Sequence, residues 1–247
     1  MKQASAEVMV QDTLRWLERA VIGLNLCPFA KSVYVKGQVH CVVSDAENLE
    51  TLRDDLLREL HDLVSFDASV RDTTVLVIQN LLHDFYDYND FLNVADDCLV
   101  ALDLEGVIQI ASFHPKYQFA GTDEDDITNF TNRSPYPTLH LIREASIDKA
   151  VAAFPEPEAI FQTNMHTLEN LGQAGWAALG VGPCHRLERQ VVGFPQQGDG
   201  LVAGMQHAAL FVEVRHGFGA HRHGLWRLQR GRHAAALALR LEQVEGP

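Results

Sequence analysis

Two residues of this sequence combine reactive side chains with special backbone positions, and the first of them is Cys27. It precedes Pro28 in the segment GLNLCPFAK, residues 23–31. Because proline fits the first position of a helix, Cys27 is predicted to be the N-cap of a new helix. Free N–H groups and the helix dipole favour a thiolate there, which predicts a lowered pKa and a nucleophilic thiol. The alternative is a small buried residue, since free cysteine is among the most buried types.

The second is His114, which ends a predicted strand and is followed by Pro115. Proline keeps the preceding residue extended, so His114 is expected to project at the edge of the sheet. Histidine is the common general acid or base near neutral pH, which makes His114 the candidate for proton transfer. By contrast, His140 lies within the next predicted strand and is interpreted as a structural histidine.

A long polar connection between residues 113 and 143 carries the remaining candidates. Connections of this length inside a compact domain are uncommon and are usually functional or disordered. Its aromatic residues favour an ordered loop, and its guanidinium and amide groups suit an anion or a carboxylate. The residues predicted to bind an anionic small molecule are Lys116, Gln118, Asn129, Asn132, Arg133 and Tyr136.

The acidic run Asp123–Asp126 in this connection has two interpretations. Its carboxylates could bind a hard cation such as Mg²⁺. Alternatively, Thr122 caps a short helix whose acidic first turn is favoured by the helix dipole. Such a helix would align Asp125, Asn129 and Arg133 along one face. The second interpretation is favoured, and no residue is assigned to a metal.

Common catalytic and cofactor-binding motifs are absent from the sequence. It contains no GxGxxG, Walker loop, HExxH or GxSxG segment, and no cofactor is assigned. The four cysteines show no CxxC spacing, which argues against a zinc knuckle and a dithiol redox motif.

Alternating helices and strands must position these residues. Apolar patterns predict strands at residues 39–43, 73–79, 107–113 and 139–142, with helices between the first three. Ser44 and Glu47 form a predicted capping box for the first of these helices. The predicted fold class is α/β (α+β), with helices on a four-stranded, mixed and largely parallel sheet. The first three strands would point the same way, so that their carboxyl ends share the edge where ligands bind.

Composition divides the chain near Pro183. Residues 1–183 hold 12 Lys and Arg against 28 acidic residues, a balance of −16, whereas residues 184–247 hold 8 Arg against 5 acidic residues. Residues 1–182 are predicted to form the α/β domain. Residues 183–247 are expected to be a poorly ordered appendage rich in Arg, His and Gly.

Charge and hydropathy restrict the partners. The acidic first part would repel phosphate backbones, so no nucleic-acid partner is expected. No apolar run approaches the length of a membrane span, and the amino terminus lacks the apolar stretch of a signal peptide. A cytoplasmic protein without a membrane partner is the simplest interpretation, and the sequence does not specify an oligomeric state.

Three motifs carry a resemblance to a known family: GLNLCPFA, FHPKYQFAG and TNRSPYPTLHLIRE. With them the chain resembles the uncharacterised bacterial domain-of-unknown-function family 1415, from about Leu14 to Gly180. The resemblance implies a small cytoplasmic bacterial protein, and it implies no reaction.

The leading functional hypothesis is a small-molecule enzyme that acts on an anionic substrate. Cys27 would be the nucleophile, His114 the acid or base, and Arg133 with Lys116 the anion anchors, with Cys27, His114 and Arg133 lining one pocket. A second hypothesis is a hard-metal enzyme that uses Asp125, Asp126 and His114. A third is a ligand-binding or protein-interaction domain without chemistry.

Overall fold

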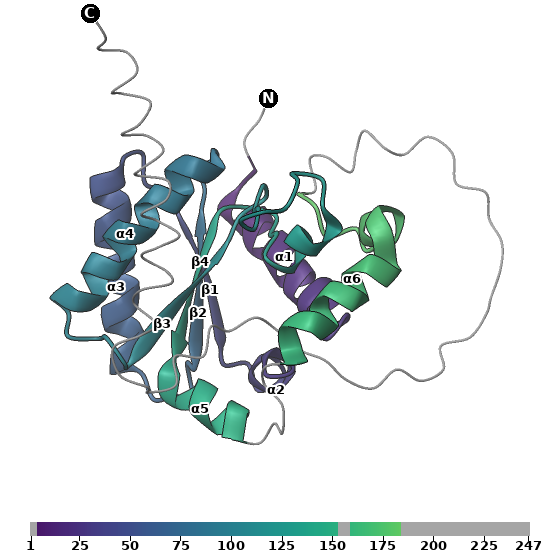
Figure 1. Ribbon diagram of the computed structural model, residues 1–247. Helices are drawn as coiled ribbons and strands as arrows, with labels where there is room; N and C mark the ends of the chain where they lie inside the picture. The colour runs from purple at the N-terminus through teal and green to yellow at the C-terminus, as the bar shows by residue number, and fades with distance from the viewer. Residues whose placement is uncertain (1–3, 153–158, 184–247) are drawn as a thin grey trace, which may run out of the picture. The chain divides into compact units, whose positions relative to one another are not determined.

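A four-stranded sheet with helices on both faces forms the centre of the protein (Figure 1). The computed structural model describes residues 4–152 and 159–183. The strands are β1 (Val39–Ser44), β2 (Thr73–Ile78), β3 (Ile108–Phe113) and β4 (Thr138–Arg143). The α-helices are α1 (Ala6–Trp16), α2 (Ala30–Val35), α3 (Leu49–Ser65), α4 (Phe85–Ala101), α5 (Glu144–Ala152) and α6 (Ala159–Ala178). A π-helix, η1 (Leu17–Ile22), continues α1, and a 3₁₀ helix, η2 (Ile127–Thr131), lies in the long connection.

The strands follow the order β1-β2-β4-β3. β1 and β2 pair in parallel, whereas β4 runs antiparallel to both β2 and β3. β1, β2 and β3 therefore point the same way, and the prediction of a four-stranded mixed sheet is confirmed. The sheet is not largely parallel as predicted: one of the three pairings between the described strands is parallel, because β4, the fourth strand in sequence, occupies a central place.

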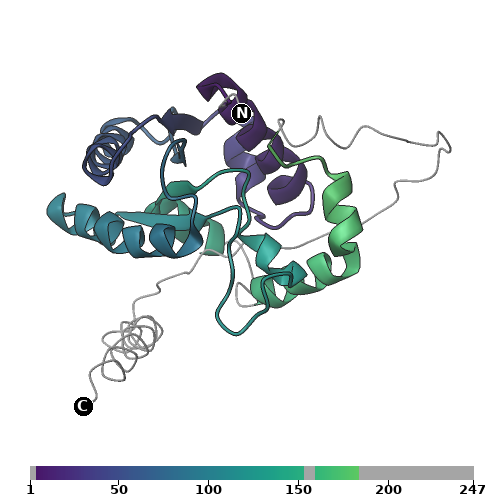
Figure 2. The same ribbon diagram turned by 90° about the horizontal axis from the view of Figure 1, so that it is seen from above.

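Helices α3 and α4 cover one face of the sheet (Figure 2). The inward side of α3 supplies Leu52, Leu56, Leu60 and Leu63, which are fully buried and lie three or four residues apart. The cap of α3 is Asn48, whose side chain accepts the N–H of Thr51. The predicted capping box is wrong, because Ser44 instead hydrogen-bonds Asp55 from the end of β1.

The opposite face of the sheet packs against α1, η1 and α2. Met9 of α1 lies on Val75 and Val77 of β2, and Phe113 of β3 joins a cluster with Trp16 and Cys27. Because side chains alternate along a strand, neighbours in sequence belong to different faces. That alternation decides which of the candidate residues can meet.

The end of the π-helix η1 leaves no space for a side chain at Gly23. The Gly23 N–H donates to Glu18 O at 2.9 Å, five residues back, which widens the turn and turns the chain toward Cys27. A Cβ atom at position 23 would lie 2.3 Å from Arg19 O, far inside contact distance. The clash is with backbone, so no side-chain rotation can relieve it.

Gly23→Ala is therefore expected to destabilise the protein by about 1–3 kcal/mol, the range typical of overpacking. Helix propensity alone would give the opposite sign, since alanine is the better helix former. Urea denaturation would measure the change in the free energy of unfolding. Gly182→Ala is the matched control, because a Cβ there meets no atom within 4 Å. An unchanged free energy for Gly23→Ala would contradict the role given to the π-helix.

The predicted appendage, residues 183–247, lies outside the described residues except for Pro183. Within the described part of the chain, no helix is both long and apolar enough to span a membrane.

Candidate functional site

A cavity of about 610 Å³ opens on the face of the sheet that carries α1, η1 and α2. We call it the sheet cavity. All four strands contribute to its floor, and η1, α2 and α5 form its walls. Its apolar lining includes Leu17, Val21, Val75, Phe113, Ile142 and Ile147, and its polar side chains include Cys27, Lys36, Asp72, Thr73, His140 and Lys149.

Cys27 is buried in the wall of the sheet cavity, three residues before α2 begins at Ala30. The predicted N-cap is wrong, because Phe29 has that position. The Cys27 Sγ accepts the N–H of Ala30, the first residue of α2, at 3.2 Å. Burial nevertheless raises the pKa of the Cys27 thiol to about 12, and the backbone N–H groups of Phe29 and Ala30 oppose this only in part. The expectation of a low pKa is wrong: Cys27 is a thiol at neutral pH because desolvation outweighs the helix terminus.

His140 shares the sheet cavity with Cys27. Leu139 and Leu141 on either side of it point into the core against α3 and α4, so alternation turns His140 the other way. Its Nε2 lies 2.6 Å from Thr73 Oγ1 of the neighbouring strand β2. Burial lowers the pKa of His140 to about 4, so the ring is neutral.

His114 lies on the other face of the sheet. Its ring packs on Phe85 and Tyr88 of α4, with centroids at 5.4 Å and 5.0 Å. Nε2 is 3.0 Å from the Leu82 carbonyl oxygen, and Nδ1 accepts the N–H of Lys116 at 3.0 Å. A carbonyl can only accept, so Nε2 carries the proton and both ring nitrogens are satisfied.

The predicted pairing of Cys27 with His114 is therefore wrong. Phe113 lines the sheet cavity, and the following residue belongs to the opposite side. His114 is fully buried, and burial lowers its pKa to about 4. Its position indicates a structural role that fixes the start of the long connection onto α4.

Asn129 and Arg133 hold the long connection together. Asn129 Oδ1 accepts from the Phe119 N–H and the Thr122 hydroxyl, at 2.9 Å and 2.8 Å. Arg133 donates to the carbonyls of Tyr117 and Glu124 and lies over the Phe130 ring. These groups bind the protein's own backbone, which accounts for their polar character without a ligand.

The other predicted binding residues are also engaged or lie elsewhere. Gln118 Nε2 donates to Thr122 O at 2.6 Å, and Asn132 Nδ2 donates to Ser112 O at 3.1 Å. Tyr136 donates its hydroxyl to the fully buried carboxylate of Asp12 at 2.8 Å, which ties the connection to α1. Lys116 is exposed, and none of the six predicted residues lines the sheet cavity.

The acidic run also has a local role. The Asp126 carboxylate caps η2 by accepting from the N–H and the hydroxyl of Thr128, and these bonds lower its pKa. Thr122 does not start the helix, and the predicted alignment of Asp125, Asn129 and Arg133 fails because η2 is a short 3₁₀ turn. Among the described residues, no three His, Cys, Asp or Glu side chains are placed to hold a metal ion.

A model of a protein family described as "Protein of unknown function (DUF1415)" matches residues 8–178. The chain belongs to the DUF1415 family. The resemblance inferred from the three motifs is thus confirmed. No curated protein and no solved structure matches the chain. The DUF1415 match includes all four strands and both Cys27 and His140.

Sequence reasoning singled out Cys27 but missed other residues that line this cavity in the DUF1415 chain, above all Thr73, His140, Lys36 and Lys149. A signal for His140 was present: it is flanked by Leu139 and Leu141, and a polar residue between two core residues of a strand faces the other side. The two lysines carry no pattern that distinguishes them from other surface lysines.

Proposed function

We propose that this protein binds a small molecule with an apolar body and an anionic group in the sheet cavity. The observation that carries the proposal is the cavity itself: about 610 Å³, with a lining that is mostly aliphatic and aromatic. Cavities of about 300–1,000 Å³ with a few placed polar groups are typical of small-molecule sites. The π-helical residues Leu17 and Val21 form part of the wall, and π-helical turns are frequent at functional sites.

The charges around the cavity favour an anion. Lys36 and Lys149 line it, and both residues are exposed. Asp72 also lines it, and its carboxylate already accepts the Ser146 hydroxyl at 2.6 Å. Two cations against one hydrogen-bonded carboxylate give a positive entrance on a chain whose formal net charge is −13.

Binding is better supported than covalent chemistry. A thiol with a pKa of about 12 has a negligible thiolate fraction at neutral pH, so Cys27 lacks the charged form that a nucleophilic cysteine needs. Among the described residues, His140 is the one histidine that lines the cavity. The proposal keeps the predicted anionic small molecule and moves its site from the long connection to the sheet cavity. A cytoplasmic location and the lack of nucleic-acid and membrane partners stay predictions from composition.

Two fluorescent probes of similar shape test this function. We expect 8-anilinonaphthalene-1-sulfonate (ANS), which has an apolar body and an anionic group, to bind with enhanced fluorescence. Ala150→Trp places a large ring in the cavity wall and should abolish this binding. Val100→Trp on α4, at a position 54% exposed on the opposite side of the sheet, is the matched control. Equal ANS binding by both variants would contradict the proposed site.

The uncharged probe N-phenyl-1-naphthylamine tests the role of the lysines. The double variant Lys36→Gln/Lys149→Gln should weaken ANS binding about 2- to 10-fold, the range for exposed ion pairs, and leave the uncharged probe unaffected. Lys31→Gln is the control, because Lys31 is an exposed lysine of α2 that does not line the cavity. Equal losses for both probes would show that charge plays no part.

A further inference from the structure

We propose that His140 gives the sheet cavity its selectivity: the ligand carries a hydroxyl or N–H group on its apolar body, which donates a hydrogen bond to Nδ1 of His140. This inference rests on the proposed function and adds the chemical class of the ligand. It starts from the hydrogen bonds that fix the protonation of the ring.

The Thr73 hydroxyl determines which nitrogen of His140 carries the proton. Thr73 Oγ1 lies 2.7 Å from the carbonyl oxygen of Leu141, which can only accept, so the single hydroxyl proton points there. Thr73 Oγ1 is therefore the acceptor in its 2.6 Å contact with His140 Nε2. Nε2 must carry the hydrogen, and in the neutral ring Nδ1 is then an unprotonated acceptor.

Nδ1 has no hydrogen-bond donor in the described part of the chain. The contacts of His140 are the bond to Thr73 and a ring contact with Phe113, whose centroid is 6.3 Å away. Although Nδ1 makes no hydrogen bond with a described residue, it is not a fully buried atom. Because His140 is half-buried and lines the cavity, we infer that the accessible surface of Nδ1 faces the cavity. A free acceptor in a mostly apolar cavity is a recognition group for a donor.

His114 provides an internal comparison. Both histidines are neutral Nε2–H tautomers, and burial lowers both pKa values to about 4. In His114 the second nitrogen is used, because Nδ1 accepts the Lys116 N–H. His140 lines the cavity, and its Nδ1 has no donor among the described residues, so a bound ligand can supply the hydrogen bond that Lys116 supplies to His114.

Nitrogen NMR of the free protein tests the first half of the inference. In ¹⁵N-labelled protein near pH 7, the two ring nitrogens of His140 should show the widely separated shifts of a neutral Nε2–H tautomer. The His140→Phe variant assigns the signals. A protonated Nδ1 in the free protein would overturn the inference, whatever the cavity binds.

Two naphthoates test the second half. Both 6-hydroxy-2-naphthoate and 6-fluoro-2-naphthoate have an apolar body and a carboxylate, but only the first carries a donor. We expect the hydroxy compound to bind about 2- to 10-fold more tightly, the value of one hydrogen bond, and to shift the Nδ1 signal. In His140→Phe this preference should vanish while binding of the fluoro compound remains.

The outcomes separate the two proposals. Binding of neither naphthoate, together with no ANS binding, contradicts the proposed function. Equal binding of both naphthoates by the wild-type protein, with no shift of Nδ1, overturns the inference about His140 and leaves the binding cavity intact. Should His140→Phe fail to fold, the wild-type preference and the Nδ1 shift decide alone.

Discussion

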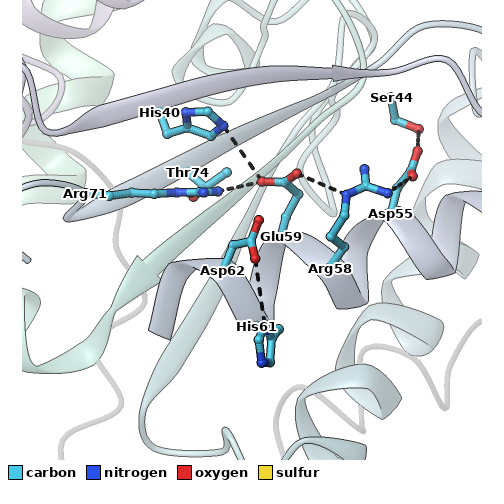
Figure 3. A network of polar contacts seen from close by, with 9 residues as sticks. All are labelled: His40, Ser44, Asp55, Arg58, Glu59, His61, Asp62, Arg71 and Thr74. Atoms are coloured by element: carbon cyan, nitrogen blue, oxygen red, sulfur yellow. Dashed lines mark hydrogen bonds and ion pairs between the residues drawn. The ribbon is translucent and has the colours of Figure 1, made fainter. Parts of the chain in front are cut away.

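Replacing Arg71 by methionine should lower the free energy of unfolding by about 3–5 kcal/mol, because the buried carboxylate of Glu59 loses the buried cation that hydrogen-bonds it. Arg71 Nη2 lies 2.5 Å from Glu59 Oε2, and the two side chains are only 8% and 6% exposed (Figure 3). Arg71 Nε also donates to Thr74 Oγ1 at 2.9 Å, so the substitution would remove polar contacts with both α3 and β2.

Arg58→Met is the matched control for this prediction. Arg58 contacts the same carboxylate at 3.7 Å and Asp55 at 2.7 Å, but its side chain is 56% exposed. Exposed ion pairs contribute about 0–1 kcal/mol, so the control should change stability little. The double variant Arg71→Met/Glu59→Leu should recover most of the loss, since a buried pair can be replaced by apolar residues. Equal losses for Arg71→Met and Arg58→Met in urea denaturation would contradict the assignment.

Acidification from pH 6.5 to pH 4 should destabilise the protein strongly, because His114 and His140 are held neutral. Their pKa values are lowered from 6.5 to about 4 by burial, whereas the unfolded chain binds protons at the ordinary value. In this window the unfolded state binds more protons than the folded state, so stability rises with pH. The part of the free energy of unfolding that depends on these two neutral rings is fully present above pH 6.5. It decreases as the pH drops to about 4, by about 3 kcal/mol for each histidine.

Urea denaturation at a series of pH values would measure this dependence. His114→Gln should reduce the slope of stability against pH between 4 and 6.5, because one neutral histidine has been removed. His40 adds to the same window, since burial also lowers its pKa. A stability independent of pH over this range would contradict the burial of both rings.

The elements of the fold could be predicted from sequence, but their pairing could not. Apolar runs located all four strands, and the alternation with helices indicated that the first three point the same way. The position of β4 between β2 and β3 depends on contacts between residues more than 60 positions apart, such as Leu76 with Leu139. The apolar periodicity within one segment carries no information about contacts between segments so far apart in sequence.

Some features of the candidate site could likewise be predicted from sequence, and others could not. The Cys-Pro segment led to a residue of the cavity, and Cys27 does accept an N–H at the start of a helix. Its pKa was predicted with the wrong sign because the helix terminus can be seen in sequence, whereas desolvation depends on distant residues such as Phe113 and Trp16. The placement of His114 beside Cys27 was wrong for another reason: the prediction used the position of His114 at the end of a strand and did not consider on which face of the sheet it lies.

The central place of β4 also sets an order for the folding of the chain. During synthesis β1 and β2 can pair as soon as residue 78 is available, whereas the partner of β3 among the described strands is β4, which ends at Arg143. Until then the β2 edge that β4 will cover stays open, and open edges invite pairing with other chains. Long-range pairing of this kind slows folding and exposes intermediates to aggregation. We therefore expect aggregation of the nascent chain to be most favoured between the appearance of β2 and that of β4.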